Sequence, residues 1–392
     1  MRKASKNAQY AALQGSFWAG YAALWGYIGV LLLAFGFDDR AVGIITASAP
    51  LLCVAISPSL GSFVDRSRRI HTWHGALFLT AFGCVGALAL RLFPRGTLLP
   101  VSALLFIAAG TALASACPFV DSLAMEATDR GEHVTYGFGR GVGSVCYAAT
   151  ILLTGFYIEQ HDTRDLLSLF IILFFVFTFF LLLFCSPRTP QPVQRRGSVK
   201  GAFALLRAKP RFVLTMLGCM FFYMSHSIPT IYGYAVVGRV GGGESAIGMM
   251  LAISAMTELP AMTLVSHLRA RKTLSCGSLL RIAAVGGVLK CSAYLLAPNV
   301  FFICLFGLLQ FFQFGFYLPA SVYYVEETIE PENRVKGQSL IHVAGSGLGA
   351  ASGNFLGGFI LDAWGASAML FTAAVCAGLS FLIFTLASHR AK

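Results

Sequence analysis

The stretch "LFIILFFVFTFFLLLF", Leu169 to Phe184, indicates the fold class, because its only polar residue is Thr178 and none is charged. A helix needs roughly 20 apolar residues to span about 30 Å of hydrocarbon, and this run approaches that length. Comparable runs recur along the chain, near 17–37, 42–61, 73–92, 98–124, 138–158, 166–185, 211–236, 245–266, 274–297, 299–323, 337–360 and 367–387. The sequence therefore predicts an all-α integral membrane protein with twelve transmembrane helices.

The composition excludes a water-soluble globular domain. Hydrophobic residues make up 57% of the 392 residues and charged residues only 12%, with 34 Phe against 17 Asp and Glu. Too few polar side chains remain to cover a soluble surface. The ten cysteines are scattered, mostly inside apolar runs and never as CxxC, so we interpret them as small hydrophobic residues. No metal site and no cofactor is predicted.

The net charge of +12 is explained by membrane topology. With the N-terminus in the cytoplasm, 21 of the 29 Lys and Arg residues fall in cytoplasmic segments, five in external loops and three inside helices. The first run is too long for a signal peptide and has no small-residue cleavage site, so we expect a retained helix. We therefore predict a multi-pass protein of the plasma (bacterial inner) membrane with both termini cytoplasmic, and no nucleic-acid partner.

One long polar stretch divides the chain into two sets of six runs. It reads "SPRTPQPVQRRGSVKGAFALLRAKPR" and is rich in Pro and Arg. We predict six-helix bundles over 1–186 and 211–392, joined by a cytoplasmic linker over 187–210. A weak echo relates the halves, since Pro118 precedes Glu126 by eight residues and Pro319 precedes Glu327 by eight. Such parallel repeats are typical of transporters that bind their solute near the membrane midplane.

Few ionisable residues lie well inside the apolar runs. A charge at the bilayer centre costs at least about 2.5 to 3.5 kcal/mol, so these residues usually face the bundle interior and serve a function there. The alternative is a structural ion pair. The acids are Asp121 and Glu258, the cations are Arg140, Arg281 and Lys290, and His226 is a weaker candidate.

The stretch "YGFGRGVGSVCY", Tyr136 to Tyr147, places Arg140 in a glycine-rich helix. Its overlapping G-x-x-x-G spacings predict close approach of a neighbouring helix. Arg140 and Tyr147 are seven residues apart and so share one face. A guanidinium and an aromatic ring on one face are suited to holding a polar ring, and Asp121 is expected either to pair with Arg140 or to share a ligand hydroxyl with it.

The loop "GSFVDRSRR" resembles the G-x-x-x-D-R-x-x-R loop of the major facilitator superfamily. Gly61, Asp65, Arg66 and Arg69 stand at the matching places. The glycine would close the helix end, and the carboxylate and arginines would bridge neighbouring helices as a conformational latch. The corresponding loop after the eighth run, "SHLRARK", is degenerate.

The stretches "PFVDSLAM" and "YGFGRGVGSVCY" resemble helices four and five of the lactose permease group, which includes nucleoside and phenylpropionate permeases. The resemblance implies that Asp121, Arg140 and Tyr147 bind substrate. It also implies that Glu258, in "TELPAM", links substrate to the proton and that Arg281 lies near the proton site.

Helix ten departs from that group. Where the lactose permease carries a His-x-x-Glu pair, "GLLQFFQFGFY" offers Gln310 and Gln313, and glutamine cannot exchange a proton at physiological pH. With Tyr317, these two form a polar stripe suited to a hydroxyl-rich ligand. Proton coupling then depends on Glu258 or Asp121, with Arg281 and His226 as further candidates, or it is absent.

These observations predict a monomeric secondary transporter that moves a small polar solute, sugar- or nucleoside-like, by alternating access, with the proton as coupling ion. Organic-anion transport and drug export on the same fold are the alternatives. A receptor without flux is a further alternative, although no soluble signalling domain accompanies the runs. An enzyme is not expected, because its only compact candidate cluster, "HTWH" at His71 to His74, has no nearby carboxylate except Asp65.

Overall fold

The computed structural model describes residues 5–67, 70–93, 98–185 and 205–389. Every regular element within these ranges is helical, as the apolar runs predict. The chain forms two compact units, one of Met1–Asp38 with Leu51–Arg195 and one of Asp39–Pro50 with Arg196–Lys392. The first residues of the second apolar run thus pack with the second unit. The division into bundles at 1–186 and 211–392 stays a prediction.

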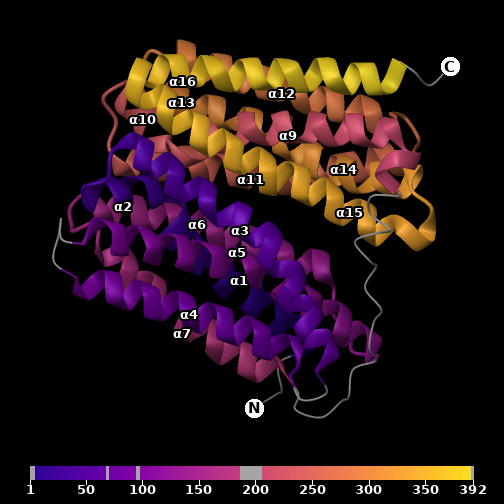
Figure 1. Cartoon of the computed structure of the whole chain (residues 1–392), viewed down its shortest axis with the longest axis horizontal. Helices are drawn as coiled ribbons and strands as arrows, with labels where there is room; N and C mark the ends of the chain where they lie inside the picture. The colour runs from indigo at the N-terminus through magenta and orange to yellow at the C-terminus, as the bar shows by residue number, and fades with distance from the viewer. Residues whose placement is uncertain (1–4, 68–69, 94–97, 186–204, 390–392) are drawn as a thin grey trace. The chain divides into compact units, whose positions relative to one another are not determined.

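The first unit is built from long helices that pack side by side. Helix α1 packs against α6 and α7, and α4 packs against α5 and α7 (Figure 1). The helices are α1 (Lys6–Trp25), α2 (Ile28–Ala34), α3 (Asp39–Arg66, whose first part belongs to the second unit), α4 (Thr72–Leu92), α5 (Leu99–Asp129), α6 (Tyr136–Ile158) and α7 (Asp165–Phe184).

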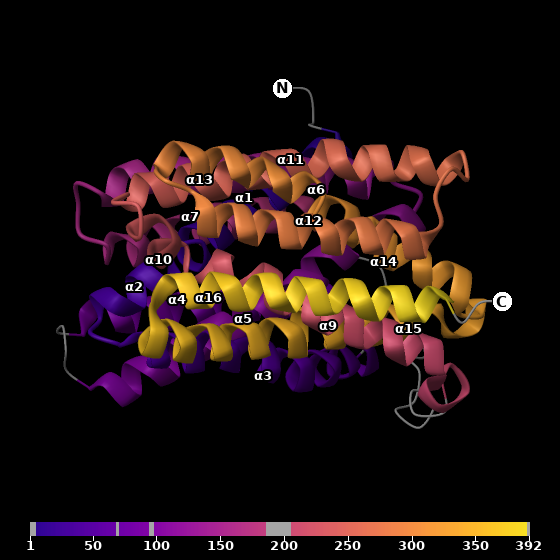
Figure 2. The same cartoon turned by 90° about the horizontal axis from the view of Figure 1, so that it is seen from above.

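In the second unit, α16 packs against α9 and α12 (Figure 2). The elements are α9 (Pro210–Ile231), α10 (Gly233–Gly238), α11 (Glu244–Ala270), α12 (Cys276–Leu296), α13 (Val300–Phe306), the 3-10 helix η1 (Gly307–Phe311), α14 (Phe314–Thr328), the 3-10 helix η2 (Pro331–Asn333), α15 (Arg334–His342), the π-helix η3 (Val343–Gly349) and α16 (Ala350–His389).

The number of membrane crossings agrees with the sequence. Ten helical stretches of the described chain are long and apolar enough to span, or eleven if α1 and α2, bent by 42°, form one span. The last stretch, Pro331–Ser388, has 58 residues, which as one helix would measure about 87 Å. It breaks at Gly365, whose φ of 79° and ψ of 176° only glycine adopts readily. Figure 1 shows α16 folding back on itself. Two crossings in this stretch give the predicted twelve.

The predicted start of the first helix, near residue 17, is wrong. Helix α1 begins at Lys6, where the Ser5 hydroxyl accepts a hydrogen bond from the Ala8 backbone N–H. Tyr10 and Gln14 are fully buried in its first turns. The polar residues just before the apolar run therefore lie inside the protein. Gln14, for example, forms hydrogen bonds with the side chains of Tyr10 and Asp121.

The glycines of α6 allow the close helix approach that their spacing predicts. A Cβ on Gly139 would lie 2.5 Å from the Tyr10 ring, and a Cβ on Gly143 would lie 2.6 Å from the Trp18 ring, both on α1. A Cβ on Gly137 would meet nothing within 4 Å. Two of these glycines therefore bring the aromatic face of α1 against the helix that holds Arg140.

The tenth and eleventh spans are irregular. Helix α13 passes into the 3-10 helix η1, and Gln313, with φ of −67° and ψ of −85°, separates η1 from α14. In the eleventh span, π-helix η3 packs against α9. Both irregularities loosen the regular helical hydrogen bonding, and π segments occur frequently at functional sites. Gln310 lies in η1, Gln313 lies at the break that follows it, and Gly345 of η3 lies beside Tyr317.

Candidate functional site

A buried glutamine organises the polar residues of the first unit. Gln14 donates from Nε2 to Asp121 Oδ1 at 2.9 Å and to the Tyr10 hydroxyl at 2.6 Å, and its Oε1 accepts from Trp18 Nε1 at 2.9 Å. The Gln14 side chain is 0% exposed. With both ends of the amide occupied, its orientation is fixed. We name Gln14, Trp18, Asp121 and Arg140 the Gln14 cluster.

Arg140 joins this cluster through an aromatic face. Its guanidinium carbon lies 3.9 Å from the centroid of the Trp18 ring, and Nη1 donates to Ser144 Oγ at 3.1 Å. No direct ion pair joins Arg140 to Asp121 in the described part of the chain, so the sequence's alternative of a shared ligand is open. Tyr147 is half-buried, two turns further along α6. The stacked guanidinium is suited to donating hydrogen bonds to a ligand.

A second glutamine organises the polar residues of the second unit. Lys290 on α12 donates from Nζ to Gln310 Oε1 at 2.6 Å, and Gln310 Nε2 donates to Glu258 Oε1, on α11, at 3.0 Å. Lys290 and Gln310 are each only 3% exposed, while Glu258 is half-buried. We name these three residues the Gln310 cluster. The amide carries the interaction between a buried cation and a carboxylate.

Other polar groups beside the break in the tenth span lack partners. Among the described residues, neither amide atom of Gln313 has a hydrogen-bond partner, nor has the Tyr317 hydroxyl or His226 Nδ1. Gln313 is 0% exposed, and the His226 ring stacks on Phe314 with centroids 4.5 Å apart. Buried polar groups without partners are rare and indicate a place where water or a ligand supplies the missing bonds.

Arg281 forms its side-chain hydrogen bond within its own helix. Arg281 Nη2 donates to Ser278 Oγ at 3.0 Å, one turn earlier on α12. It lines a cavity of about 350 Å³ that also contacts Phe381 and Thr385 of α16. Nine residues separate Arg281 from Lys290, which is about 13 Å along a helix axis. Lys290, also on α12, is the cation of the Gln310 cluster.

The latch residues lie at the margin of the described structure. Arg69 lies outside the described residues, and the side chains of Asp65 and Arg66 are likewise outside the description. Gly61 is buried and does not end its helix, since α3 continues to Arg66, five residues beyond the predicted end. The latch stays a prediction.

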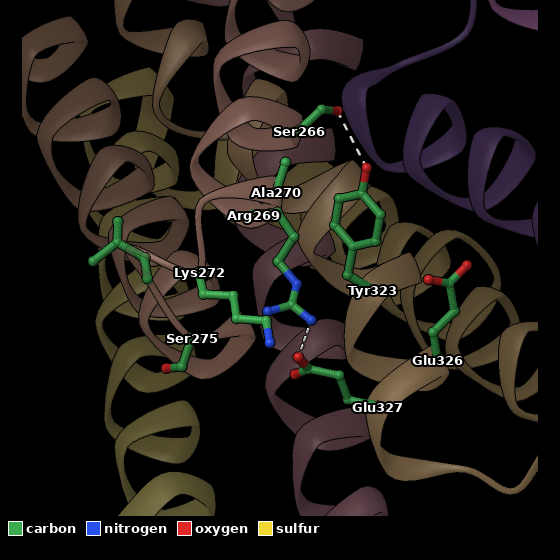
Figure 3. A pocket seen from close by; sticks show the side chains of 9 residues that line it. Ser266, Arg269, Ala270, Lys272, Ser275, Tyr323, Glu326 and Glu327 are labelled. Atoms are coloured by element: carbon green, nitrogen blue, oxygen red, sulfur yellow. Dashed lines mark hydrogen bonds and ion pairs between the residues drawn. The ribbon is translucent and has the colours of Figure 1, made fainter.

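In the second unit, the degenerate loop after α11 takes part in an ion pair. Figure 3 shows Arg269 directed toward Glu327, with which it forms a salt bridge, and Tyr323 donating to Ser266 Oγ at 3.2 Å. These residues line a pocket of about 600 Å³. Glu126, the counterpart of Glu327 in the sequence echo, accepts instead from the Thr72 hydroxyl. The two halves thus use the repeated glutamate differently.

The HxxH motif serves as a helix cap. The His71 backbone N–H donates to His74 Nδ1 at 3.0 Å, and the two rings stack at the start of α4. Within the described ranges, no group of three or more His, Cys, Asp or Glu side chains could hold a metal ion. All ten cysteines are free.

Sequence reasoning missed Gln14, Trp18 and the hydrogen-bond partner of Lys290. Gln14 and Trp18 were overlooked because the first helix was predicted to start at residue 17, which left Gln14 outside it. Their i, i+4 spacing was the available signal, since such residues are neighbours on a helix surface. Lys290 was counted as an intramembrane cation, but no pattern in the sequence paired it with Gln310, twenty residues later.

Comparisons with known proteins agree with this fold. The family model described as "MFS_1 like family" matches residues 14–373. The maltose permease of Geobacillus stearothermophilus is 25% identical over 365 residues, which cover 91% of this chain and 87% of that protein. An uncharacterized transporter of Bacillus subtilis is 21% identical over 362 residues, 90% of this chain and 87% of its own.

Solved structures show the same architecture. The nucleoside transporter NupG superposes with a TM-score of 0.80 at 15% identity, with 100% of both chains covered. A bacterial homolog of the human lysosomal transporter Spinster, inward-facing and unoccupied, superposes with a TM-score of 0.70 at 15% identity, covering 98% of this chain and 96% of that chain. At these identities the likeness shows the fold alone.

Proposed function

The chain belongs to the MFS_1-like family of major facilitator transporters, and on that premise we propose that it moves a small polar solute, sugar- or nucleoside-like, by proton symport. The solute class is supported by the maltose permease relative and by the polar character of both clusters. The proposed mechanism is alternating access between two six-helix bundles, as expected for this architecture.

One observation carries the proposal: each unit contains an acid and a cation within membrane helices that are linked indirectly, through Trp18 and Gln14 in the first unit and through Gln310 in the second. A structural ion pair would favour direct contact, because charges buried in a low dielectric need close partners. Indirect pairs leave hydrogen-bonding capacity for a solute and for a proton. In the first unit, Arg140 and Tyr147 are the proposed solute contacts, with Asp121 accepting from a solute hydroxyl.

Glu258 is the proposed proton carrier. Gln310 and Gln313 cannot exchange a proton, whereas the Glu258 carboxylate is half-buried and accepts a hydrogen bond from Gln310. His226 is a second candidate, and Arg281, which donates to Ser278 on its own helix, is a third. We propose that both termini are cytoplasmic, because the basic residues concentrate in the loops on that side. We further propose that the protein acts as a monomer in the plasma membrane.

An organic anion is the second candidate solute. Well inside the apolar runs, the three cations Arg140, Arg281 and Lys290 stand against the two acids Asp121 and Glu258. The surplus positive charge would attract a carboxylate. The two solute classes make opposite predictions in one binding assay.

The test is thermal stabilisation of the purified protein by maltose, uridine and benzoate in turn. A ligand that binds only the folded protein raises its apparent stability, by about 2.7 kcal/mol at 100 times Kd. We expect stabilisation by a neutral polyol or nucleoside, and its loss in Arg140→Ala. Stabilisation by benzoate alone would contradict a sugar- or nucleoside-like solute and support an organic anion. A polyol effect that persists in Arg140→Ala would remove the first-unit cluster from the binding site.

A further inference from the structure

We propose that Lys290 couples proton and solute binding, as the counter-charge of Glu258 that acts through Gln310. The inference rests on the proposed function and extends it to a residue outside the predicted site. Lys290 is nearly fully buried, and Gln310 is its hydrogen-bonded route to the carboxylate.

The two hydrogen bonds of the Gln310 amide indicate the protonation states of Lys290 and Glu258. The amide oxygen of Gln310 accepts from the lysine ammonium, which is a donor only, and its nitrogen donates to the glutamate, which when ionised is an acceptor only. The arrangement therefore fits a protonated Lys290 and a deprotonated Glu258. In that state the cluster has no net charge. This is the state expected when the transporter reorients without solute or proton.

Protonation of Glu258 changes this balance. One proton from the solvent adds to a carboxylate oxygen, the carboxylate becomes a neutral carboxylic acid, and the cluster gains one positive charge on the buried Lys290. An uncompensated buried cation is costly. A solute oxygen that accepts a hydrogen bond from the ammonium would lower that cost, so a bound solute and a bound proton favour each other. Release of the proton restores the neutral cluster and weakens the hold on the solute.

Among the described residues, Glu258 is the carboxylate that acts on Lys290. Other ionisable side chains near Lys290 include those of His226 on α9 and of Cys291 and Tyr294 on α12, and Tyr223 on α9 lies near Glu258. The Lys290 ammonium also lies 5.4 Å from the centroid of the Tyr294 ring. Glu258 is thus the anion available to balance Lys290.

The first readout needs no solute. Infrared difference spectroscopy of the purified protein at a series of pH values follows the carbonyl band of the protonated Glu258 carboxyl, identified by its absence in Glu258→Gln. In the wild type we expect this band to disappear as the pH rises from mildly acidic to mildly alkaline. In Lys290→Met, the carboxylate has lost its counter-charge, and we expect the band to persist across the same range.

The second readout uses whichever of maltose, uridine or benzoate stabilises the wild type. We expect the Kd of the wild type to rise by about tenfold between mildly acidic and mildly alkaline pH, within the usual range of coupling between two sites, and to be independent of pH in Lys290→Met. Lys290→Arg keeps the charge and should keep the pH dependence.

The double variant Lys290→Met with Glu258→Gln controls for folding, because it lacks the uncompensated Lys290 charge that Glu258→Gln leaves, and it should be at least as stable as Glu258→Gln. If Lys290→Met does not fold, the comparison passes to these two variants. Both should bind solute with a Kd that is independent of pH, and the double variant, which has no ammonium to donate to the solute, should bind more weakly than Glu258→Gln. Equal Kd values in the two, a pH-dependent Kd in either, or a Glu258 band that titrates in Lys290→Met as in the wild type, would overturn the inference. An unresponsive wild type in the binding assay combined with the expected infrared result would contradict the proposed solute class and leave the Lys290–Glu258 linkage standing.

Discussion

The Gln14 cluster and the Gln310 cluster each link a cation to a carboxylate inside the membrane helices, but through different groups. In each, a buried glutamine accepts a hydrogen bond at its oxygen and donates to a carboxylate from its nitrogen. In the first unit, the donor to the glutamine is the neutral indole of Trp18, and the cation stacks on that ring. In the second unit, the donor is the cation itself.

The difference divides the labour between the clusters. Arg140 is half-buried and held by an aromatic face, which leaves its planar fork suited to a ligand. Lys290 is nearly fully buried and directly bonded, so its charge is tied to the protonation of Glu258. The comparison suggests binding in the first cluster and coupling in the second.

The largest expected effect is the loss of solute binding in Arg140→Ala. Hydrogen bonds to a charged group contribute about 1.5 to 3 kcal/mol each, so removal of the guanidinium should weaken binding by at least about tenfold and abolish uptake. Arg281→Ala is the matched control, because it removes the same group from a residue that contacts Ser278. Uptake into proteoliposomes measures both, and equal losses would end the assignment of Arg140.

The two glutamines allow the comparison to be sharpened directly. Gln14→Met should weaken solute binding by about tenfold at every pH, since it removes the support of Asp121 and Trp18. Gln310→Met should instead flatten the pH dependence of binding, because it cuts the link between Lys290 and Glu258. Binding isotherms at several pH values test both, and the same change in both variants would contradict a division of labour.

The sequence was sufficient for the fold and for part of each cluster. Apolar runs and the distribution of basic residues predict twelve helices, and the scarcity of charges in those runs identifies Asp121, Arg140, Glu258 and Lys290. The roles of Gln14 and Gln310 as links could not be predicted from the sequence. Gln14 and Asp121 are 107 residues apart and Gln310 and Glu258 are 52 apart, so tertiary packing alone determines these contacts. Arg281 was predicted near the proton site by resemblance; in the structure it donates to Ser278, and its part in proton coupling stays a prediction.

The close packing behind Arg140 gives the next prediction. Gly143→Ala places a Cβ 2.6 Å from the Trp18 ring, and overpacking of this kind costs typically about 1 to 3 kcal/mol. We expect a lower unfolding temperature and weaker solute binding, because the ring that supports Arg140 must move. Gly137→Ala, on the same helix with open space around the new methyl group, should be neutral or slightly stabilising. Thermal unfolding of the two variants would contradict this packing if their unfolding temperatures agreed.

The smallest expected effect belongs to Trp18→Phe. The ring face under Arg140 is kept, while the N–H that donates to Gln14 is lost. A weaker cation–π contact and one lost neutral hydrogen bond together predict a loss of about 0.5 to 1 kcal/mol in solute binding, less than that of Gln14→Met. Titration calorimetry measures the change. A loss as large as that of Arg140→Ala would mean that the indole contacts the solute itself.

The division of labour is tested most directly by comparing proton-driven accumulation with solute counterflow in proteoliposomes that contain Glu258→Gln or Arg140→Ala. Counterflow exchanges solute across the membrane without net proton movement, and accumulation requires the proton to be released. The account predicts that Glu258→Gln keeps counterflow and loses accumulation, whereas Arg140→Ala loses both. Accumulation by Glu258→Gln at the wild-type level would contradict it, as would counterflow by Arg140→Ala.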